Sequence, residues 1–289
     1  MSAGPVRQAR LDVGVVGAGR VGAVLGAALA RAGHRVVAAS GVSDTSRARA
    51  ALLLPRVPLL PADEVARICG LLLLAVPDDA LPDLVAGLAE TGALAPGQLV
   101  VHTSGRYGLG VLEPAARLRA LPVALHPVLP FAGTEVDLAR LSGACFGVTA
   151  PEVLLPVGEA LVLEMGGDPV RVDDALRPLW HAALAHGANH LVTLVASAAD
   201  LLRAAGAADP AAVLAPLLGA ALDGALRGGD AALTGPVARG DAGTVAAHLA
   251  VLPDDVRPAY VALARLTAGR ALASGRLRAD QAAGLLAVL

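Results

Sequence analysis

Gly17, Gly19 and Gly22 have the spacing Gly-x-Gly-x-x-Gly near the start of the chain. In this pattern the first glycine permits a tight turn, the second lets backbone approach a pyrophosphate, and the third lets a helix pack close to the preceding strand. The apolar run 11–16 predicts that strand, and residues 23–31 predict that helix. We therefore expect a dinucleotide to bind the turn made by Gly17, Ala18, Gly19, Arg20, Val21 and Gly22. The alternative is a glycine-rich turn without a ligand.

The residues after the second predicted strand bear on the choice of dinucleotide. An NAD-binding unit carries an Asp or Glu roughly 20 residues beyond the first glycine, where it binds the ribose 2′-OH. Residues 36–43 contain no acid, whereas Ser40 stands at the strand end and Arg47 and Arg49 follow. This favours NADP over NAD, with Ser40 and Arg47 as candidate ligands of the 2′-phosphate. Two solvated arginines on a surface helix are the alternative, and Asp44 could still turn toward the ribose.

Polar and turn-forming residues follow three further predicted strands. Ligands of open parallel sheets bind beyond the carboxyl ends of the strands. Val76 and Pro77 would line the cofactor, His102 and Ser104 would polarise a carbonyl or imine, and His126 would contact substrate. Each has a structural alternative: a strand stop with a helix cap, a capped turn, and a histidine that only packs.

The second half of the chain offers a polar stripe on a predicted helix. Steps of about 100° per residue place Thr193 about 40° and Asp200 about 20° from Asn189. On a buried helix such residues need partners or a ligand, so they predict either helix–helix hydrogen bonds or a substrate cleft, with Asn189 as a catalytic residue and Thr193 as a substrate ligand. His186 and His190 have the i,i+4 spacing of a metal pair, but no HExxH-type acid accompanies them, so no metal site is expected.

Arg239 lies in the loop 233–241, just before Asp241, which can cap the next helix. An arginine beside a helix N-terminus suits a carboxylate or phosphate, so Arg239 is a candidate substrate ligand. The alternative is an ordinary loop in which Arg239 pairs with Asp241 or another acid.

Alternating strands and helices must position these residues. Strands are predicted at 12–16, 35–40, 70–76, 98–103, 123–126, 145–149 and 169–172, with helices at 21–32, 79–91 and 151–165. This order implies right-handed crossovers and a mostly parallel sheet covered on both faces. Beyond Val172 only helices are predicted, at 173–205, 210–227, 241–252, 254–274 and 279–289. The fold class is therefore α/β, with a Rossmann-like dinucleotide-binding domain at 1–172 and an all-helical substrate and dimerisation domain at 173–289.

Composition narrows the function classes. The chain has 289 residues, 55% of them apolar, and 23 basic against 25 acidic residues, a balance that argues against a nucleic-acid surface. Cys69 and Cys145 are far apart, which indicates a reducing compartment and no disulfide framework. Residues 1–10 lack the apolar core of a signal peptide, and charge, Gly or Pro interrupts the apolar stretches, so we expect a cytoplasmic protein without a membrane span. Every basic residue is Arg, which excludes lysine chemistry.

The chain resembles bacterial, largely actinobacterial, proteins that join a Rossmann-like domain to a C-terminal helical domain of unknown function. The matching segments are 15–22, 101–105, His126-Pro127, 180–194 and 233–241, of which the Leu-Thr-Gly-Pro…Arg-Gly-Asp loop is the most specific. More distantly, it is similar to the 6-phosphogluconate dehydrogenase-like superfamily, which includes ketopantoate reductase and pyrroline-5-carboxylate reductase.

The distant resemblance implies a nicotinamide-dependent enzyme of small carboxylates that dimerises through C-terminal helices. The 3-hydroxyacid dehydrogenases of that superfamily carry a catalytic Lys four residues before an Asn on the interdomain helix. Asn189 fits the Asn, but Ala185 stands where the Lys would be. We therefore expect an NADP-dependent reductase of a C=O or C=N group, as a homodimer, with a non-catalytic NADP-binding sensor or partner protein as the rival.

Overall fold

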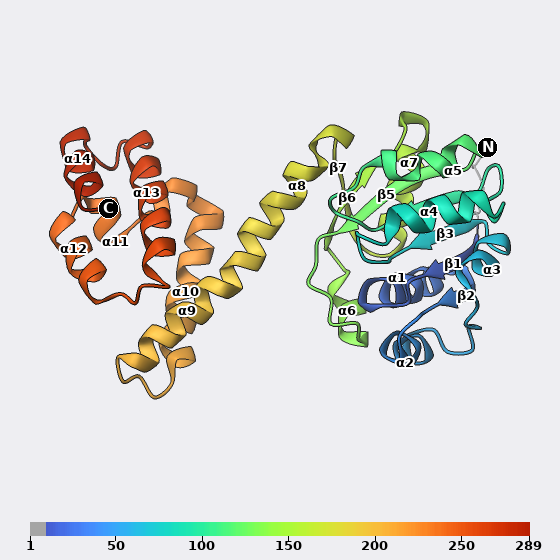
Figure 1. The fold of residues 1–289 in the computed structure, drawn as a ribbon, viewed down its shortest axis with the longest axis horizontal. Coiled ribbons are helices and arrows are strands. Elements are labelled where there is room, and N and C mark those ends of the chain that lie inside the picture. Colours follow the sequence, from blue (N-terminus) through green and yellow to red (C-terminus); the bar gives the residue numbers. More distant parts are fainter. Residues whose placement is uncertain (1–9) are drawn as a thin grey trace, which may run out of the picture. The chain divides into compact units, whose positions relative to one another are not determined.

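The computed structural model describes residues 10–289. The prediction about a signal peptide therefore concerns residues that lie almost entirely outside the described range. The chain divides into two compact units, Met1–Gly187 (unit 1) and Ala188–Leu289 (unit 2), and each is described by itself. Figure 1 labels the elements along the chain.

A seven-stranded sheet forms the centre of unit 1, in the order β2-β1-β3-β4-β5-β6-β7. Neighbouring strands run parallel except at the β5–β6 pair, which is antiparallel. The mostly parallel α/β fold predicted from the sequence is confirmed. The strands are β1 (Asp12–Val16), β2 (Arg35–Ser40), β3 (Leu71–Leu74), β4 (Leu99–His102), β5 (Leu121–Pro127), β6 (Cys145–Thr149) and β7 (Asp168–Arg171).

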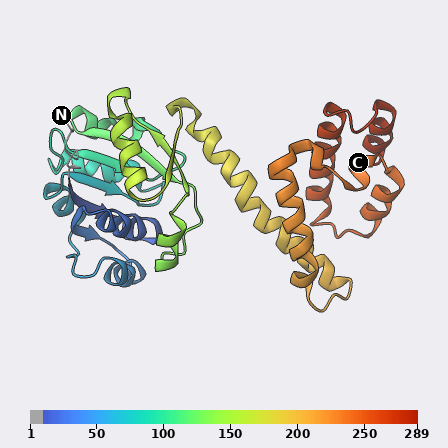
Figure 2. The same cartoon turned by 180° about the vertical axis from the view of Figure 1, so that it is seen from behind.

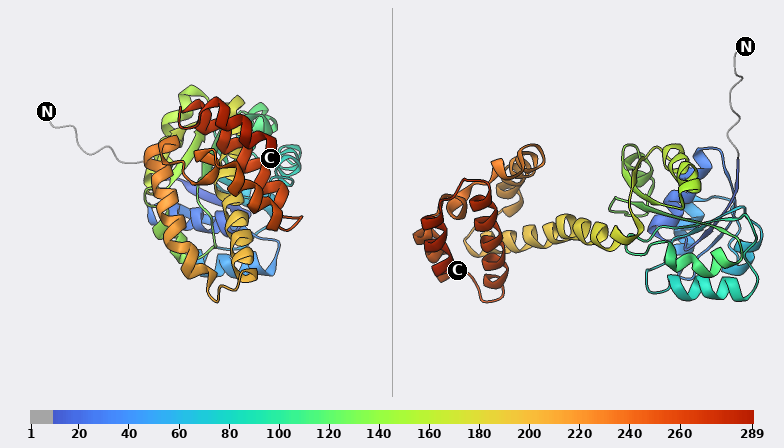
Figure 3. Two further views of the ribbon diagram at one scale, coloured as in Figure 1. Left: turned by 90° about the vertical axis from the view of Figure 1, so that its left-hand side faces the viewer. Right: turned by 90° about the horizontal axis from the view of Figure 1, so that it is seen from above.

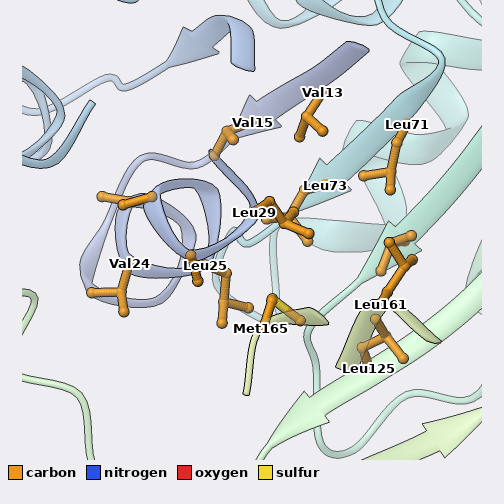
Figure 4. Close-up of a cluster of buried hydrophobic side chains, with 14 of the residues drawn as sticks. Val13, Val15, Val24, Leu25, Leu29, Leu71, Leu73, Leu125, Leu161 and Met165 are labelled. Atoms are coloured by element: carbon orange, nitrogen blue, oxygen red, sulfur yellow. The ribbon is translucent and has the colours of Figure 1, made fainter. Parts of the chain in front are cut away.

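Helices cover both faces of this sheet, as the right-hand view of Figure 3 shows for α1 and α7 on one side and α4 and α5 on the other. Because side chains of a strand alternate between faces, Val13 and Val15 pack toward α1, whereas Leu72 and Leu74 pack toward α4. Figure 4 shows the first of these two cores. The helices of unit 1 are α1 (Arg20–Arg31), α2 (Asp44–Leu53), α3 (Ala62–Arg67), α4 (Leu81–Glu90), α5 (Glu113–Arg117), α6 (Glu135–Arg140), α7 (Leu155–Glu164) and α8 (Arg177–Leu184).

Unit 2 is entirely helical in its described residues, as the reverse view of Figure 2 shows. Its core lies among α11–α14, where small alanines at 264, 268 and 271 let the helices approach closely around Val245 and Leu285. The helices are α9 (His190–Ala204), α10 (Pro210–Gly228), α11 (Gly235–Arg239), α12 (Ala242–Val251), α13 (Arg257–Ala273) and α14 (Ala279–Val288).

A π-helical turn, Ala185–Asn189, separates α8 from α9. The sequence pattern predicts one uninterrupted helix here, because a π turn leaves no compositional signal. The sheet ends at Arg171, close to the predicted domain boundary at Val172, while unit 1 continues through α8 to Gly187.

One helical segment of the described chain, Pro210–Arg239, is long and apolar enough to cross a membrane by length and composition alone. Its mean hydropathy is 1.3, and 6% of its most apolar window is buried. A single helix of this kind is weak evidence for a membrane span. The sequence interpretation expected no span because charge, Gly or Pro interrupts the apolar stretches, and this segment contains Pro216, Gly219 and Asp223.

Candidate functional site

The glycine turn between β1 and α1 has the geometry that its motif predicts. Gly17 has a φ of +91°, and a Cβ there would stand 2.6 Å from the carbonyl oxygen of Ala75. A Cβ on Gly22 would collide with the carbonyl oxygen of Gly17. Gly17 and Gly22 are therefore glycines because the turn, β3 and α1 lie in close contact.

Gly19 differs, because a Cβ there would have Gly17 O as its nearest neighbour, at 3.9 Å. This open space lies at the N-terminus of α1, where the first intrahelical bond runs from the Ala23 amide to Gly19 O. The amides of Arg20, Val21 and Gly22 precede it and have no partner within the helix. The cradle fits a pyrophosphate, which would replace those missing partners.

Ser40 lies at the end of β2, half-buried, and its carbonyl accepts hydrogen bonds from the amides of Gly17 at 3.1 Å and Ala18 at 2.8 Å. The main chain of Ser40 thus holds the glycine turn against β2. The Ala18 amide is committed to Ser40 and is not free to bind a phosphate.

Arg47 lies on α2 and reaches back over the β2–α2 loop. Its guanidinium donates to Val42 O at 2.8 Å and to a carboxylate oxygen of Asp44 at 2.7 Å. Asp44 is therefore paired with Arg47. Arg49, which is half-buried, and Arg20 both lie against Gly133, so two further arginines lie beside the start of α1.

Val76 and Pro77 follow β3 beside the glycine turn, where Ala75 donates its amide to Val16 O at 2.8 Å. Val76 is half-buried and Pro77 is exposed. The alternative interpretation, an acid that caps the next helix, is wrong, because the N-cap of α4 is Ala80 and has no side-chain cap.

His102 ends β4 and is fully buried, at 0% exposure. Its Nε2 lies 3.1 Å from Gly108 O, so Nε2 carries the proton and Nδ1 is a bare acceptor, without a partner among residues 10–289. Ser104, 8% exposed, accepts hydrogen bonds at Oγ from the amides of Arg106 and Tyr107. The hydroxyl of Ser104 therefore stabilises the turn after β4 and still has its own proton to donate.

Arg177 fastens the start of α8 to the same turn. Its buried guanidinium donates to Ser104 O at 2.6 Å, to Tyr107 O at 2.5 Å and to Thr149 Oγ1 at 2.9 Å. None of these three acceptors is a carboxylate, so a buried positive charge lies beside the turn. Burial lowers the pKa of Arg177 to about 10, still far above neutrality.

His126, near the end of β5, lies next to two residues of α8. Its Nδ1 accepts a hydrogen bond from the indole Nε1 of Trp180 at 3.1 Å, and its ring meets that of His181 edge to face at 5.7 Å. Burial, together with the charge of Arg177, lowers the pKa of His126 to about 4 and that of His102 to about 3. Both imidazoles are therefore neutral at pH 7.

The sequence interpretation missed Trp180 and Arg177. The one available signal was that Trp180 is the sole tryptophan of a chain with only 2% aromatic residues. Arg177 carried no signal, since 23 arginines occur along the chain and nothing marks the buried one.

The candidate residues of unit 2 lie on its surface. Asn189 ends the π-helical turn, and Thr193 and Asp200 lie on α9, all three exposed within the chain. Because these side chains are exposed, water can satisfy their hydrogen bonds, and they do not need the partners or the ligand that a buried polar stripe would need. Arg239 ends α11, is exposed, and forms no ion pair within residues 10–289, while Asp241 caps α12 by accepting from the Thr244 amide at 3.0 Å.

No group of three or more His, Cys, Asp or Glu side chains that could hold a metal occurs in the described part of the chain. His186 lies within the π-helical turn and His190 begins α9, so the two do not share one regular α-helical stretch.

Comparison with known proteins matches two family models. Residues 1–127 match the Rossmann-like domain, and residues 144–267 match a domain of unknown function, DUF2520. No curated protein matches the chain.

Solved structures share the fold over nearly the whole chain. A candidate NADP oxidoreductase from Bacteroides fragilis is 24% identical, with a TM-score of 0.76 over 90% of this chain and 98% of that one. An imine reductase from Pseudomonas sp. is 18% identical, with a TM-score of 0.64 over 97% and 100%. Pyrroline carboxylate reductase from Plasmodium falciparum, solved with NADP bound, is 13% identical, with a TM-score of 0.56 over 95% and 98%.

These likenesses establish the fold, and the two family models identify its parts. The chain joins an N-terminal Rossmann-like domain to a C-terminal DUF2520 domain.

Proposed function

We propose that this protein is an NADP-dependent oxidoreductase that reduces a C=O or C=N group of a small carboxylate substrate. The observation that carries the proposal is the cradle at Gly19, where close packing of Gly17 and Gly22 leaves open space in front of free helix amides. The solved relatives described as imine and pyrroline carboxylate reductases support it, because they share the fold that presents this cradle.

Ser40 at the end of β2 and Arg47 on α2 favour NADP over NAD. Ser40 and Arg47 would bind the 2′-phosphate, with Arg47 exchanging Asp44 for the phosphate. Val76 and Pro77 would line the cofactor along the strand ends. When bound, the nicotinamide supplies the hydride.

The proposed substrate contacts begin with His126 and Ser104, which have protons to donate at the carboxyl edge of the sheet. His102, proposed from the sequence as a polarising group, has a fully buried ring, so its geometry favours a supporting position behind the turn. Asn189 and Thr193 remain proposed as orienting and binding residues.

Arg239 is proposed to hold the substrate carboxylate, since it is exposed and has no ion pair in the described chain. The test is kinetic: Arg239→Ala should raise KM for the carboxylate substrate about tenfold or more, as expected for loss of a charge-assisted contact. Arg276→Ala, another exposed arginine of unit 2, is the control. An unchanged KM in Arg239→Ala would exclude the anion role.

The reaction is tested by NADPH oxidation with a panel of small 2-keto and cyclic imino acids. Turnover of at least one member supports a reductase.

A second candidate is a non-catalytic NADP-binding sensor or partner protein. It is favoured by Ala185, which stands where related dehydrogenases have a lysine, in a chain whose basic residues are all arginine. Tight NADPH binding without turnover of any panel member would support this candidate.

For partners, we propose a cytoplasmic homodimer that does not bind nucleic acid or membranes. Exposed apolar side chains on α10 support a second copy as the partner, because large apolar side chains gather at subunit interfaces. They are Val213, Leu217, Leu222 and Leu226.

A further inference from the structure

The ring of His126 is held in one tautomer by its neighbour. An indole nitrogen can only donate, so the 3.1 Å contact from Trp180 Nε1 requires a bare lone pair on His126 Nδ1. The proton of the neutral imidazole is therefore on Nε2. Protonating Nδ1 as well would point two N–H groups at each other, so the same contact disfavours the imidazolium.

The fold builds this contact with a glycine on the next strand. His126 of β5 pairs with Gly147 of β6, so the two residues lie side by side on the sheet. A Cβ on Gly147 would stand 3.1 to 3.3 Å from three atoms of the Trp180 indole. The missing side chain at Gly147 thus makes room for the indole to lie on β6 with its N–H directed at His126.

A second glycine, Gly105, packs directly against the Nε2 edge of the His126 ring and against His181. A Cβ on Gly105 would stand 2.7 Å from His126 Nε2 and 2.7 Å from His181 Cδ2. No residue of the described chain accepts a hydrogen bond from His126 Nε2. The Nε2–H of this half-buried ring is therefore a donor without an acceptor among residues 10–289, and the missing side chain of Gly105 is what keeps a Cβ from blocking it.

The charges around the ring favour an electron-rich partner for this donor. Arg177 is the cation that acts on the ring and donates only to neutral oxygens, and His181 and His102 are further titratable groups that interact with it. Asp174 and Asp78 lie near enough to act on the charge of Arg177, but neither forms an ion pair with it among the described residues. A neutral donor beside a buried cation suits a ligand atom that carries or gains negative charge.

We propose that His126 donates a hydrogen bond from Nε2 to the carbonyl oxygen or imine nitrogen of the substrate, and that Trp180 is the positioning residue that fixes this tautomer. His126 polarises the acceptor group and keeps its own proton: the substrate carbon takes up the hydride from NADPH, and the oxygen or nitrogen takes up its proton from water. The identity of the acceptor rests on the proposed reductase function, whereas the tautomer does not.

The first arm of the test needs no substrate. Nitrogen NMR of the seven histidines, with His126 assigned from the loss of its signals in His126→Gln, should show His126 as the Nε2–H tautomer from pH 8 down to pH 5. Trp180→Phe should give mixed tautomers and a titration nearer the ordinary pKa of histidine. Gly147→Val retains Trp180 but pushes its indole away from His126, so it should also give mixed tautomers and a higher pKa of His126. An Nδ1–H tautomer in the wild-type protein, or an unaltered ring in a folded Trp180→Phe protein, overturns the positioning role.

The second arm measures NADPH oxidation with the panel of keto and imino acids. His126→Leu should lower kcat/KM about 10²-fold, as loss of one preorganised donor does, and His126→Gln, which keeps an N–H near the Nε2 position, should recover part of it. Trp180→Phe should lower kcat/KM about tenfold and introduce a pH dependence near pH 6. His248→Gln, a histidine of unit 2 bonded to Tyr260 at 2.8 Å, is the matched control.

The two arms separate the two proposals. If no panel member is turned over, the reductase proposal fails, and the NMR arm still decides whether Trp180 fixes His126. If turnover occurs and His126→Leu has unchanged kcat/KM, the donor role is overturned while the reductase stands.

Discussion

Arg177 donates from Nη2 to the carbonyl oxygen of Ser104 at 2.6 Å, across 73 positions of the sequence. This bond joins the start of α8 to the turn after β4. Because residues at i, i+3 and i+4 of a helix share a face, fixing Arg177 also fixes Trp180 and His181 over the strand ends. The buried arginine thereby positions the residues around His126.

Alanine should have different effects at Gly19, which faces open space, and at Gly22, which is closely packed. Gly19→Ala should fold with an unchanged melting temperature, since its Cβ meets open space, but should weaken NADPH binding at least tenfold by occupying the pyrophosphate cradle. Gly22→Ala should lower the melting temperature, because its Cβ collides with Gly17 O. Thermal unfolding and titration calorimetry measure both. Normal NADPH affinity in Gly19→Ala would contradict the cradle.

Arg47 should distinguish the two cofactors. Arg47→Ala should weaken NADPH binding about 10- to 100-fold, the value of a charge-assisted hydrogen bond, and leave NADH binding unchanged. The control is Arg117→Ala, an exposed arginine that pairs with Glu113 on α5. Equal losses for both cofactors would show that Arg47 does not contact the 2′-phosphate.

Acid should destabilise unit 1 through its buried histidines. The pKa of His126 falls from 6.5 to about 4 on folding, so between these values the unfolded chain binds more protons. The free energy of unfolding should therefore drop as pH falls from 6.5 to 4, by roughly 3 kcal/mol for His126 alone. Denaturant unfolding of the wild-type protein and of His126→Gln, compared at each pH, measures the contribution of His126 to the free energy of unfolding. A stability difference between the two proteins that stays constant from pH 7 to 4 would contradict the burial of a neutral ring.

The apolar side chains of α10 should support self-association. Leu217 and Leu226 are 65% and 79% exposed in the single chain. Replacing both with Glu should convert a dimer to a monomer in sedimentation analysis. Val153→Glu, at a position 84% exposed in unit 1, should leave the dimer intact. A wild-type protein that sediments as a monomer at micromolar concentration would rule out the proposed homodimer.

The sequence predicted the sheet well because its strands are short apolar runs bounded by glycine, proline and polar residues. Strands 12–16, 35–40 and 145–149 have the predicted bounds, and the glycine turn has the expected geometry. These features depend on local backbone chemistry, which neighbouring residues specify.

The surroundings of His126 could not be predicted in this way. Its partner Trp180 is 54 positions away, and the contact depends on Gly147 being opposite His126 in an antiparallel pair. The burial of His102 also depends on how α8 and the turn after β4 close over the strand end. Such relationships arise from tertiary packing between distant residues, and neither composition nor local sequence pattern predicts them.

Calorimetric titration of the intact protein with NADPH and with NADH tests the central claim most directly. The account predicts one NADPH bound per chain, at least tenfold more tightly than NADH. Absence of binding by either cofactor would contradict the glycine cradle as a dinucleotide site, and tighter binding of NADH would contradict the 2′-phosphate site at Ser40 and Arg47.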